Sequence, residues 1–147
     1  MEPEYNSQIH HRRSIRLQDY DYSQDGYYYI TICTKNFVKY FGQIKNGKME
    51  LSKIGHIVCD EWIKVCRGVC NTPLQTNNRF RSPSNNLGAI IRSFKSSVKR
   101  QCNKNNFPHF QWHRNYYEHI IRDEIELYIK RKYIINNPLK WHLDKNN

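Results

Sequence analysis

This sequence of 147 residues contains no long apolar run and few acidic residues. No stretch approaches the roughly 20 apolar residues that a membrane-spanning helix needs, so we expect no membrane partner. Residues 1–4 lack the basic start and apolar core of a signal peptide, which predicts a cytoplasmic protein. Asp and Glu number 13 against 24 Lys and Arg, and the net charge of +11 predicts a polyanionic partner.

Metal-binding patterns of cysteine are also missing. The five cysteines are an odd number, and Cys66 and Cys70 alone stand close enough to share a metal ion. Zinc takes four ligands, and no second Cys or His pair has a matching spacing. We therefore expect reduced thiols and assign no zinc site.

Aromatic residues, in contrast, are plentiful, at 14% of the chain with 11 tyrosines. Disordered chains are poor in aromatics, so the composition favours a folded protein. A chain of this length supports one hydrophobic core, which predicts a single domain over residues 1–147.

The first half of the chain predicts strands followed by a helix. Residues 27–34 are aromatic and β-branched without interruption, which indicates an interior strand buried on both faces. Asn46-Gly47 lies between residues 40–45 and 48–51 and predicts a hairpin with a type I′ turn. Apolar positions at helical spacing predict a helix over 53–65, with Ser52 as its N-cap.

The second half predicts two further helices and strand structure between them. Helices are expected over 87–104 and 124–136, the latter with a capping box of Asp123 and Glu126. Residues 110–122 favour one strand or two short ones. Residues 67–86 have loop composition without periodicity, which is uncommon inside a compact domain.

The helix over 87–104 carries a cationic stripe formed by Arg92, Lys95, Lys99 and Arg100. A solvated surface is the usual explanation for charge on a helix. No acidic residue lies in this segment to neutralise the stripe, so we expect it to contact phosphates.

Tyr133 and Asn137 are four residues apart, so their side chains share one face of the last predicted helix. A tyrosine beside an amide oxygen is the minimum for attack on a phosphodiester, but the phenol needs a metal or base to activate it. By spacing alone, core packing of the tyrosine and helix termination at Asn137-Pro138 explain the pair more simply.

Seven segments follow the order found in a known family: residues 12–17, 20–22, 28–34, 41–42, 87–96, 112–122 and the Tyr-Ile-Ile-Asn-Asn-Pro motif at 133–138. In these segments, within residues 11–66 and 87–143, the chain resembles single-tyrosine HUH transposases of the REP-associated type. The resemblance implies a ferredoxin-like α+β sheet with packed helices, typically in a dimer. It also implies cleavage of single-stranded DNA at hairpin ends through a phosphotyrosine, with a divalent metal such as Mg or Mn.

The resemblance assigns roles to individual residues. Tyr133 matches the nucleophile, and Asn137 matches a third metal ligand. Basic residues near the N-terminus and on the predicted helix over 87–104 match DNA-binding positions: Arg12, Arg13, Arg16, Arg92, Lys95 and Lys99.

The chain departs from the family between the helices over 53–65 and 87–104, where a His-hydrophobic-His strand belongs. No histidine occurs between His56 and His109. Residues 67–86 stand in place of that strand, so two of three metal ligands, and with them a central strand of the sheet, are expected to be deleted. We do not expect His109, His113 or His119 to replace them.

Three interpretations follow. The first is a transposase copy that retains DNA binding but is catalytically impaired, because no metal polarises the phosphate. The second is an active nuclease with an unfamiliar metal site. The third is a basic nucleic-acid-binding module, or an unstable remnant, without a catalytic role.

Overall fold

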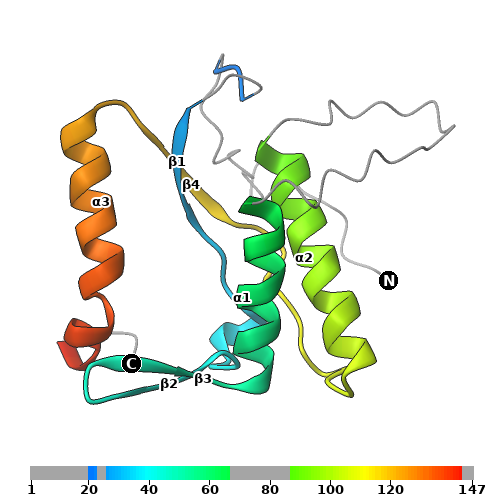
Figure 1. Cartoon of the computed structure of the whole chain (residues 1–147). Coiled ribbons are helices and arrows are strands. Elements are labelled where there is room, and N and C mark those ends of the chain that lie inside the picture. The colour runs from blue at the N-terminus through cyan, green and yellow to red at the C-terminus, as the bar shows by residue number, and fades with distance from the viewer. Residues whose placement is uncertain (1–19, 23–25, 67–86, 144–147) are drawn as a thin grey trace, which may run out of the picture.

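The computed structural model describes residues 20–22, 26–66 and 87–143. They form an α+β fold in which two antiparallel strand pairs accompany three α-helices (Figure 1). The predicted fold class is therefore confirmed. The predictions for Arg12, Arg13, Arg16 and the loop over 67–86 lie outside the described residues.

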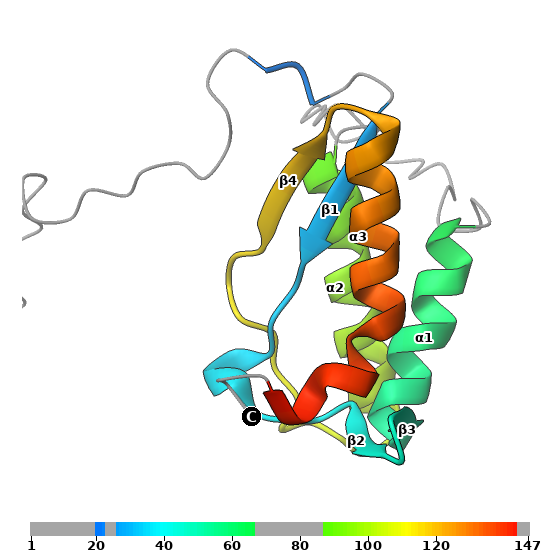
Figure 2. The same cartoon turned by 90° about the vertical axis from the view of Figure 1, so that its left-hand side faces the viewer.

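The larger sheet joins β1 (Tyr27–Thr31) to β4 (Tyr117–Ile121), with Tyr29 opposite His119. Helices α1 (Lys53–Cys66) and α2 (Leu87–Lys104) lie on one side of this pair and α3 (Glu124–Asn136) on the other (Figures 1 and 2). Within the described ranges β1 has one neighbouring strand, so its other edge is unpaired.

The prediction that residues 27–34 form a strand buried on both faces is wrong. The strand ends at Thr31, and its side chains are half-buried or exposed, with Tyr27 55% exposed. A strand becomes fully covered when it has neighbours on both edges and layers on both faces. The described part of the sheet has two strands, so that cover is missing here.

The predicted hairpin is present as β2 (Gly42–Lys45) and β3 (Lys48–Leu51). Asn46 and Gly47 adopt φ of 51° and 70°, the left-handed pair that a type I′ turn requires. The 3₁₀ helix η2 (Pro138–Leu143) folds back onto this hairpin, where Leu139 lies close to Gly47. The C-terminal segment thus packs on the hairpin.

The core lies between α1, α2 and the segment that follows α2. Its buried residues are Ile54, Phe94, Val98, Cys102 and Phe110. Ser52 caps α1 as predicted, because its hydroxyl accepts a hydrogen bond from Gly55 N at 3.0 Å. The same hydroxyl donates to Tyr40 O at 2.6 Å and so ties the start of α1 to the loop that precedes β2.

Helix α3 begins at the predicted cap, where Asp123 accepts a hydrogen bond from Glu126 N at 2.7 Å. The reciprocal bond of the capping box differs from the prediction, since Glu126 accepts from Arg122 N rather than from Asp123 N. Leu127 is the buried residue of this helix, while Ile125 and Ile129 are 74% and 57% exposed. Helix α3 is thus the least covered of the three.

Residues 110–116, which the sequence favoured as strand, are largely irregular. The described strand in that region is β4, and Trp112 forms a single bridge with Thr34. Two lysines of α2 bind the backbone carbonyls of this segment, as described below, so these carbonyls are satisfied without a sheet neighbour.

Candidate nucleic-acid interface

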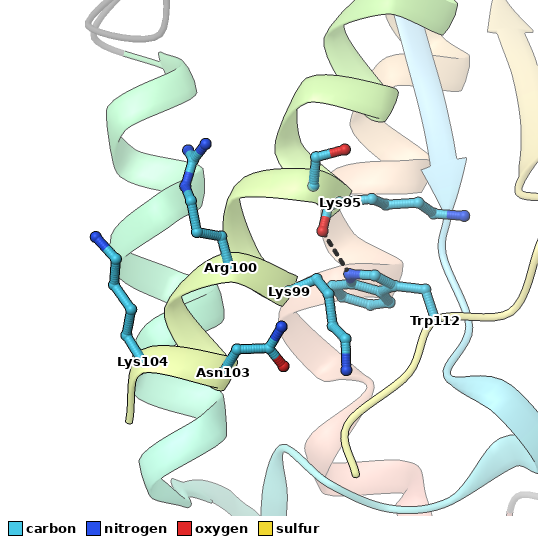
Figure 3. A pocket seen from close by; sticks show the side chains of 7 residues that line it. Lys95, Lys99, Arg100, Asn103, Lys104 and Trp112 are labelled. Carbon is cyan, nitrogen blue, oxygen red and sulfur yellow. Dashed lines mark hydrogen bonds between the residues drawn. The ribbon is translucent and has the colours of Figure 1, made fainter. Parts of the chain in front are cut away.

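A shallow groove of about 570 Å³ runs along α2 and ends at the indole of Trp112 (Figure 3). Residues four apart on the helix line its length, because they repeat on the same face. The lining side chains are Lys95, Ser96, Lys99, Arg100, Asn103, Lys104 and Trp112.

The surroundings of the groove are strongly basic in sequence. Residues 87–117 contain six Lys and Arg and no acidic residue, and residues 26–49 contain no acidic residue either. These segments supply α2, the turn before β2 and the segment before β4, which pack together around Trp112. A surface of one sign of charge attracts a polyanion.

Lys95 is less available for binding a phosphate than its position in the cationic stripe suggests. Its Nζ donates to the carbonyls of His113 at 2.9 Å, Arg114 at 3.4 Å and Asn115 at 3.0 Å. Burial lowers the pKa of the Lys95 ammonium, since desolvation disfavours the charged form. Lys95 therefore fastens the segment before β4 to α2.

Lys99 has a similar position one turn further along the helix. Its Nζ donates to Phe110 O at 2.7 Å and to Pro108 O at 2.8 Å. Lys95 and Lys99 together bind five backbone carbonyls, so part of their charge is already used within the fold. The phosphate contacts predicted for these two lysines remain a prediction.

The more exposed cations on α2 are Arg92, Arg100 and Lys104. Arg100 donates to Ser97 at 3.3 Å, and Figure 3 shows Arg100 and Lys104 pointing away from Trp112. Sequence reasoning assigned Arg92 to DNA binding but did not include Lys104 or Trp112. The spacing of Lys104 four residues after Arg100 was the available signal for it, whereas Trp112 joins the groove by tertiary packing.

Trp112 forms a fixed wall of the groove. Its indole N–H donates to Lys95 O at 3.1 Å, and its ring lies 4.9 Å from that of Phe110 and 5.6 Å from that of Phe41. The contact with Phe94, at 5.9 Å, joins it to the helix core. Four aromatic rings thus hold the groove in one shape.

Tyr133 lies on the other side of the sheet, on α3. Its ring meets the ring of Tyr29 edge-on at 6.3 Å, and Lys130 Nζ lies 4.9 Å from the Tyr29 ring. The side chain is 54% exposed. Asn137 follows one turn later as the half-buried C-cap, with its N–H donating to Ile134 O at 3.4 Å. Tyr133 thus contacts β1 through its ring, while about half of the side chain is exposed.

The donors near Tyr133 do not fit the divalent metal that the resemblance implies. His119 is in close hydrogen-bond contact with Glu126, and this hydrogen bond lowers the pKa of the Glu126 carboxyl. No cluster of three or more His, Cys, Asp or Glu that could hold a metal exists among the described residues. His109 packs beside Tyr40 and His113 beside Phe37. These two histidines and His119 therefore have different neighbours and do not form a common metal site.

Comparison with known proteins identifies a relative that matches over nearly its whole length. An uncharacterized protein of Haemophilus influenzae is 38% identical over an alignment of 176 positions that covers 99% of this chain and 98% of the relative. The chain belongs to the same family as this protein. The alignment is longer than the chain, so at least 29 positions, the difference between 176 and 147, hold residues of the relative alone. No family model and no solved structure matches the chain.

Proposed function

We propose that this member of the family is a transposase-related protein that binds single-stranded DNA hairpins through the groove along α2 and no longer cleaves them. It would act in the cytoplasm. The observation that carries the proposal is the groove itself, where basic side chains and an indole come from segments, residues 87–117 with the adjoining 26–49, that contain no acidic residue. Phosphates of a DNA strand fit such a surface, and aromatic rings suit unpaired bases.

The loss of cleavage rests on the missing ligands. The sequence contains no histidine between His56 and His109, and the donors described around Tyr133 do not form a three-residue cluster. A phenol with a pKa near 10 is a weak nucleophile unless a metal or base activates it. Without phosphate polarisation, worth several kcal/mol in the transition state, we expect cleavage to fall by orders of magnitude.

Two observations support an internal deletion as the cause of the missing histidine ligands. The relative holds residues at 29 or more aligned positions where this chain has none, enough for one or two strands of typical length. In addition, the described part of the sheet leaves one edge of β1 unpaired.

The test is a binding isotherm for a DNA hairpin with a single-stranded flank, measured by fluorescence anisotropy at several salt concentrations. The parent should bind with an affinity that falls steeply with salt. The double variant Arg100→Ala/Lys104→Ala should bind more weakly, and its salt slope should be smaller by about 1.4, which corresponds to two fewer single-strand phosphate contacts.

The matched control is Lys48→Ala/Lys53→Ala, which removes two exposed lysines outside the groove. Equal losses in both double variants would mean that net charge alone drives binding, and the groove assignment would be wrong. A parent protein that does not bind the hairpin would overturn the proposed function altogether.

Binding of duplex and single-stranded DNA with equal affinity would favour a general basic nucleic-acid-binding module instead. The +11 net charge is the observation that favours this second candidate.

A further inference from the structure

The turn Lys35–Phe37 that follows β1 has an unusual backbone. Asn36 and Phe37 both adopt left-handed conformations, with φ of 56° and 55°. Asparagine tolerates this region, but a bulky aromatic residue adopts it rarely. Strain of this kind persists where surrounding contacts determine the backbone, and it concentrates at functional sites.

Hydrogen bonds hold the turn in place from both ends. Phe37 N donates to Thr34 O at 3.2 Å, and the Thr34 hydroxyl donates to Val38 O at 2.7 Å. Thr34 is itself buried and bridges to Trp112, the wall of the groove. The strained conformation is thus anchored to the candidate site.

The anchored turn exposes the Phe37 ring instead of burying it. The side chain is 73% exposed, and its ring lies 6.2 Å from the ring of His113 at an interplanar angle of 24°, a stacked arrangement. Core formation does not explain why a phenylalanine is held in a strained backbone at the surface. A flat aromatic surface in this position suits another flat ring.

The stacked rings of Phe37 and His113 lie next to the groove, and basic residues surround them as well. The carbonyl of His113 accepts the hydrogen bond from Lys95, and Trp112 is the preceding residue. Lys35 lies in the turn itself, where its Nζ donates to Gln111 at 2.8 Å, and Lys39 follows two residues after Phe37. A phosphate backbone is complementary to this acid-free surface, whereas the basic surface of a second copy is not.

We infer that Phe37 and His113 form a stacking platform for one unpaired base of the single-stranded DNA whose phosphates follow the α2 groove. The inference rests on the proposed function and extends it by naming the residues that select single strands. Stacking on an aromatic side chain needs a free base face, which a paired duplex does not offer.

The experiment compares Phe37→Gly, Phe37→Trp and Val38→Ala in binding to a single-stranded oligonucleotide and to a blunt duplex of the same length. Phe37→Gly should weaken single-strand binding about 10-fold, the usual scale for one stacked base. The same variant should unfold at a higher temperature, because glycine accepts the left-handed backbone. Phe37→Trp should retain single-strand affinity, and duplex binding should be unchanged in all three variants.

Val38→Ala is the matched control, since Val38 is also exposed, lies in the same loop and has an ordinary φ of −62°. A fluorescent base analogue, 2-aminopurine, scanned along the oligonucleotide should be quenched at one position by the parent and unquenched by Phe37→Gly. Higher stability together with weaker binding is a combination that a purely structural role would not produce.

Other outcomes separate the two proposals. If the parent fails to bind single-stranded DNA, the proposed function and the platform fail together. If the parent binds and Arg100→Ala/Lys104→Ala weakens it, but Phe37→Gly binds as tightly as the parent, the platform alone is wrong. If Phe37→Gly changes self-association in light scattering and leaves DNA binding intact, the ring belongs to a contact between copies, which also overturns the platform.

Discussion

The ring of Tyr133 on α3 meets the ring of Tyr29 on β1 edge-on, with their centroids 6.3 Å apart. This contact joins the proposed former nucleophile to β1, which has one neighbouring strand within the described ranges. Lys130 Nζ lies 4.9 Å from the same Tyr29 ring and adds a cation–π contact. Tyr133 thus lies against β1, and the described residues hold no cluster of three or more His, Cys, Asp or Glu that could bind a metal.

We expect no covalent protein–DNA adduct when the parent is incubated with a DNA hairpin and either magnesium or manganese. Denaturing gel electrophoresis with a labelled oligonucleotide measures this directly. Tyr133→Phe is the control, and it should bind the hairpin as the parent does, because Tyr133 lies on α3, across the sheet from the α2 groove. An adduct that forms with the parent and disappears with Tyr133→Phe would show an active tyrosine and contradict the loss of cleavage.

Lys99→Met should destabilise the fold more than it weakens DNA binding. The substitution leaves the carbonyl of the buried Phe110 without this donor, and an unsatisfied buried acceptor costs about 1–3 kcal/mol, whereas water can replace the donor at the exposed Pro108 carbonyl. Urea unfolding midpoints measure this cost, with Lys104→Met as the exposed control on the same helix. Unchanged stability together with a steep loss of affinity would show instead that the Lys99 ammonium meets a phosphate.

Glu61 should make the fold sensitive to acid. Burial raises the pKa of this carboxyl, but hydrogen bonds from Lys64 and Ser97 outweigh burial and hold the pKa below its ordinary value of 4.5. A group with a lowered folded pKa stabilises the protein above its unfolded pKa and loses that contribution as the pH falls through the folded value. Stability should therefore be unaffected near neutrality and decline below about pH 4.5.

Glu61→Gln tests this dependence by denaturant unfolding over a range of pH. The variant should be less stable than the parent at neutral pH, by about 1.5–3 kcal/mol for hydrogen bonds to a charged group, and the difference should shrink in acid. Glu50→Gln is the control, because its ion pair with Lys45 is exposed and such pairs contribute about 0–1 kcal/mol. A constant difference at every pH would exclude ionisation of Glu61 as the cause.

Gly55→Ala should destabilise the protein even though alanine is the better helix former. A Cβ at this position would lie 2.0 Å from Phe41 O, so α1 would have to move away from the loop that precedes β2. We expect a cost of about 1–3 kcal/mol, the range for overpacking, in thermal or urea unfolding. Ser93→Ala, at an exposed position of α2, should be neutral or stabilising. A gain in stability from Gly55→Ala would contradict this close approach.

The local pattern of the sequence determined the helix ends and the hairpin turn. Asn46-Gly47 required a left-handed turn, Ser52 and Asp123 supplied side-chain caps, and Pro138 ended the last helix, so these boundaries followed from interactions between near neighbours. The cationic stripe on α2 and the shared face of Tyr133 and Asn137 followed equally from helical spacing.

Tertiary structure decided how these elements are used. Whether residues 27–31 become an interior strand depends on the number of neighbouring strands, which local propensity does not contain. Lys95 and Lys99 have the same spacing as phosphate-binding residues, but the segment that returns along α2 brings five carbonyls to them. Phe37 and His113 are far apart in sequence, so their stack, and the groove beside it, arises only when the chain folds and places the two segments side by side.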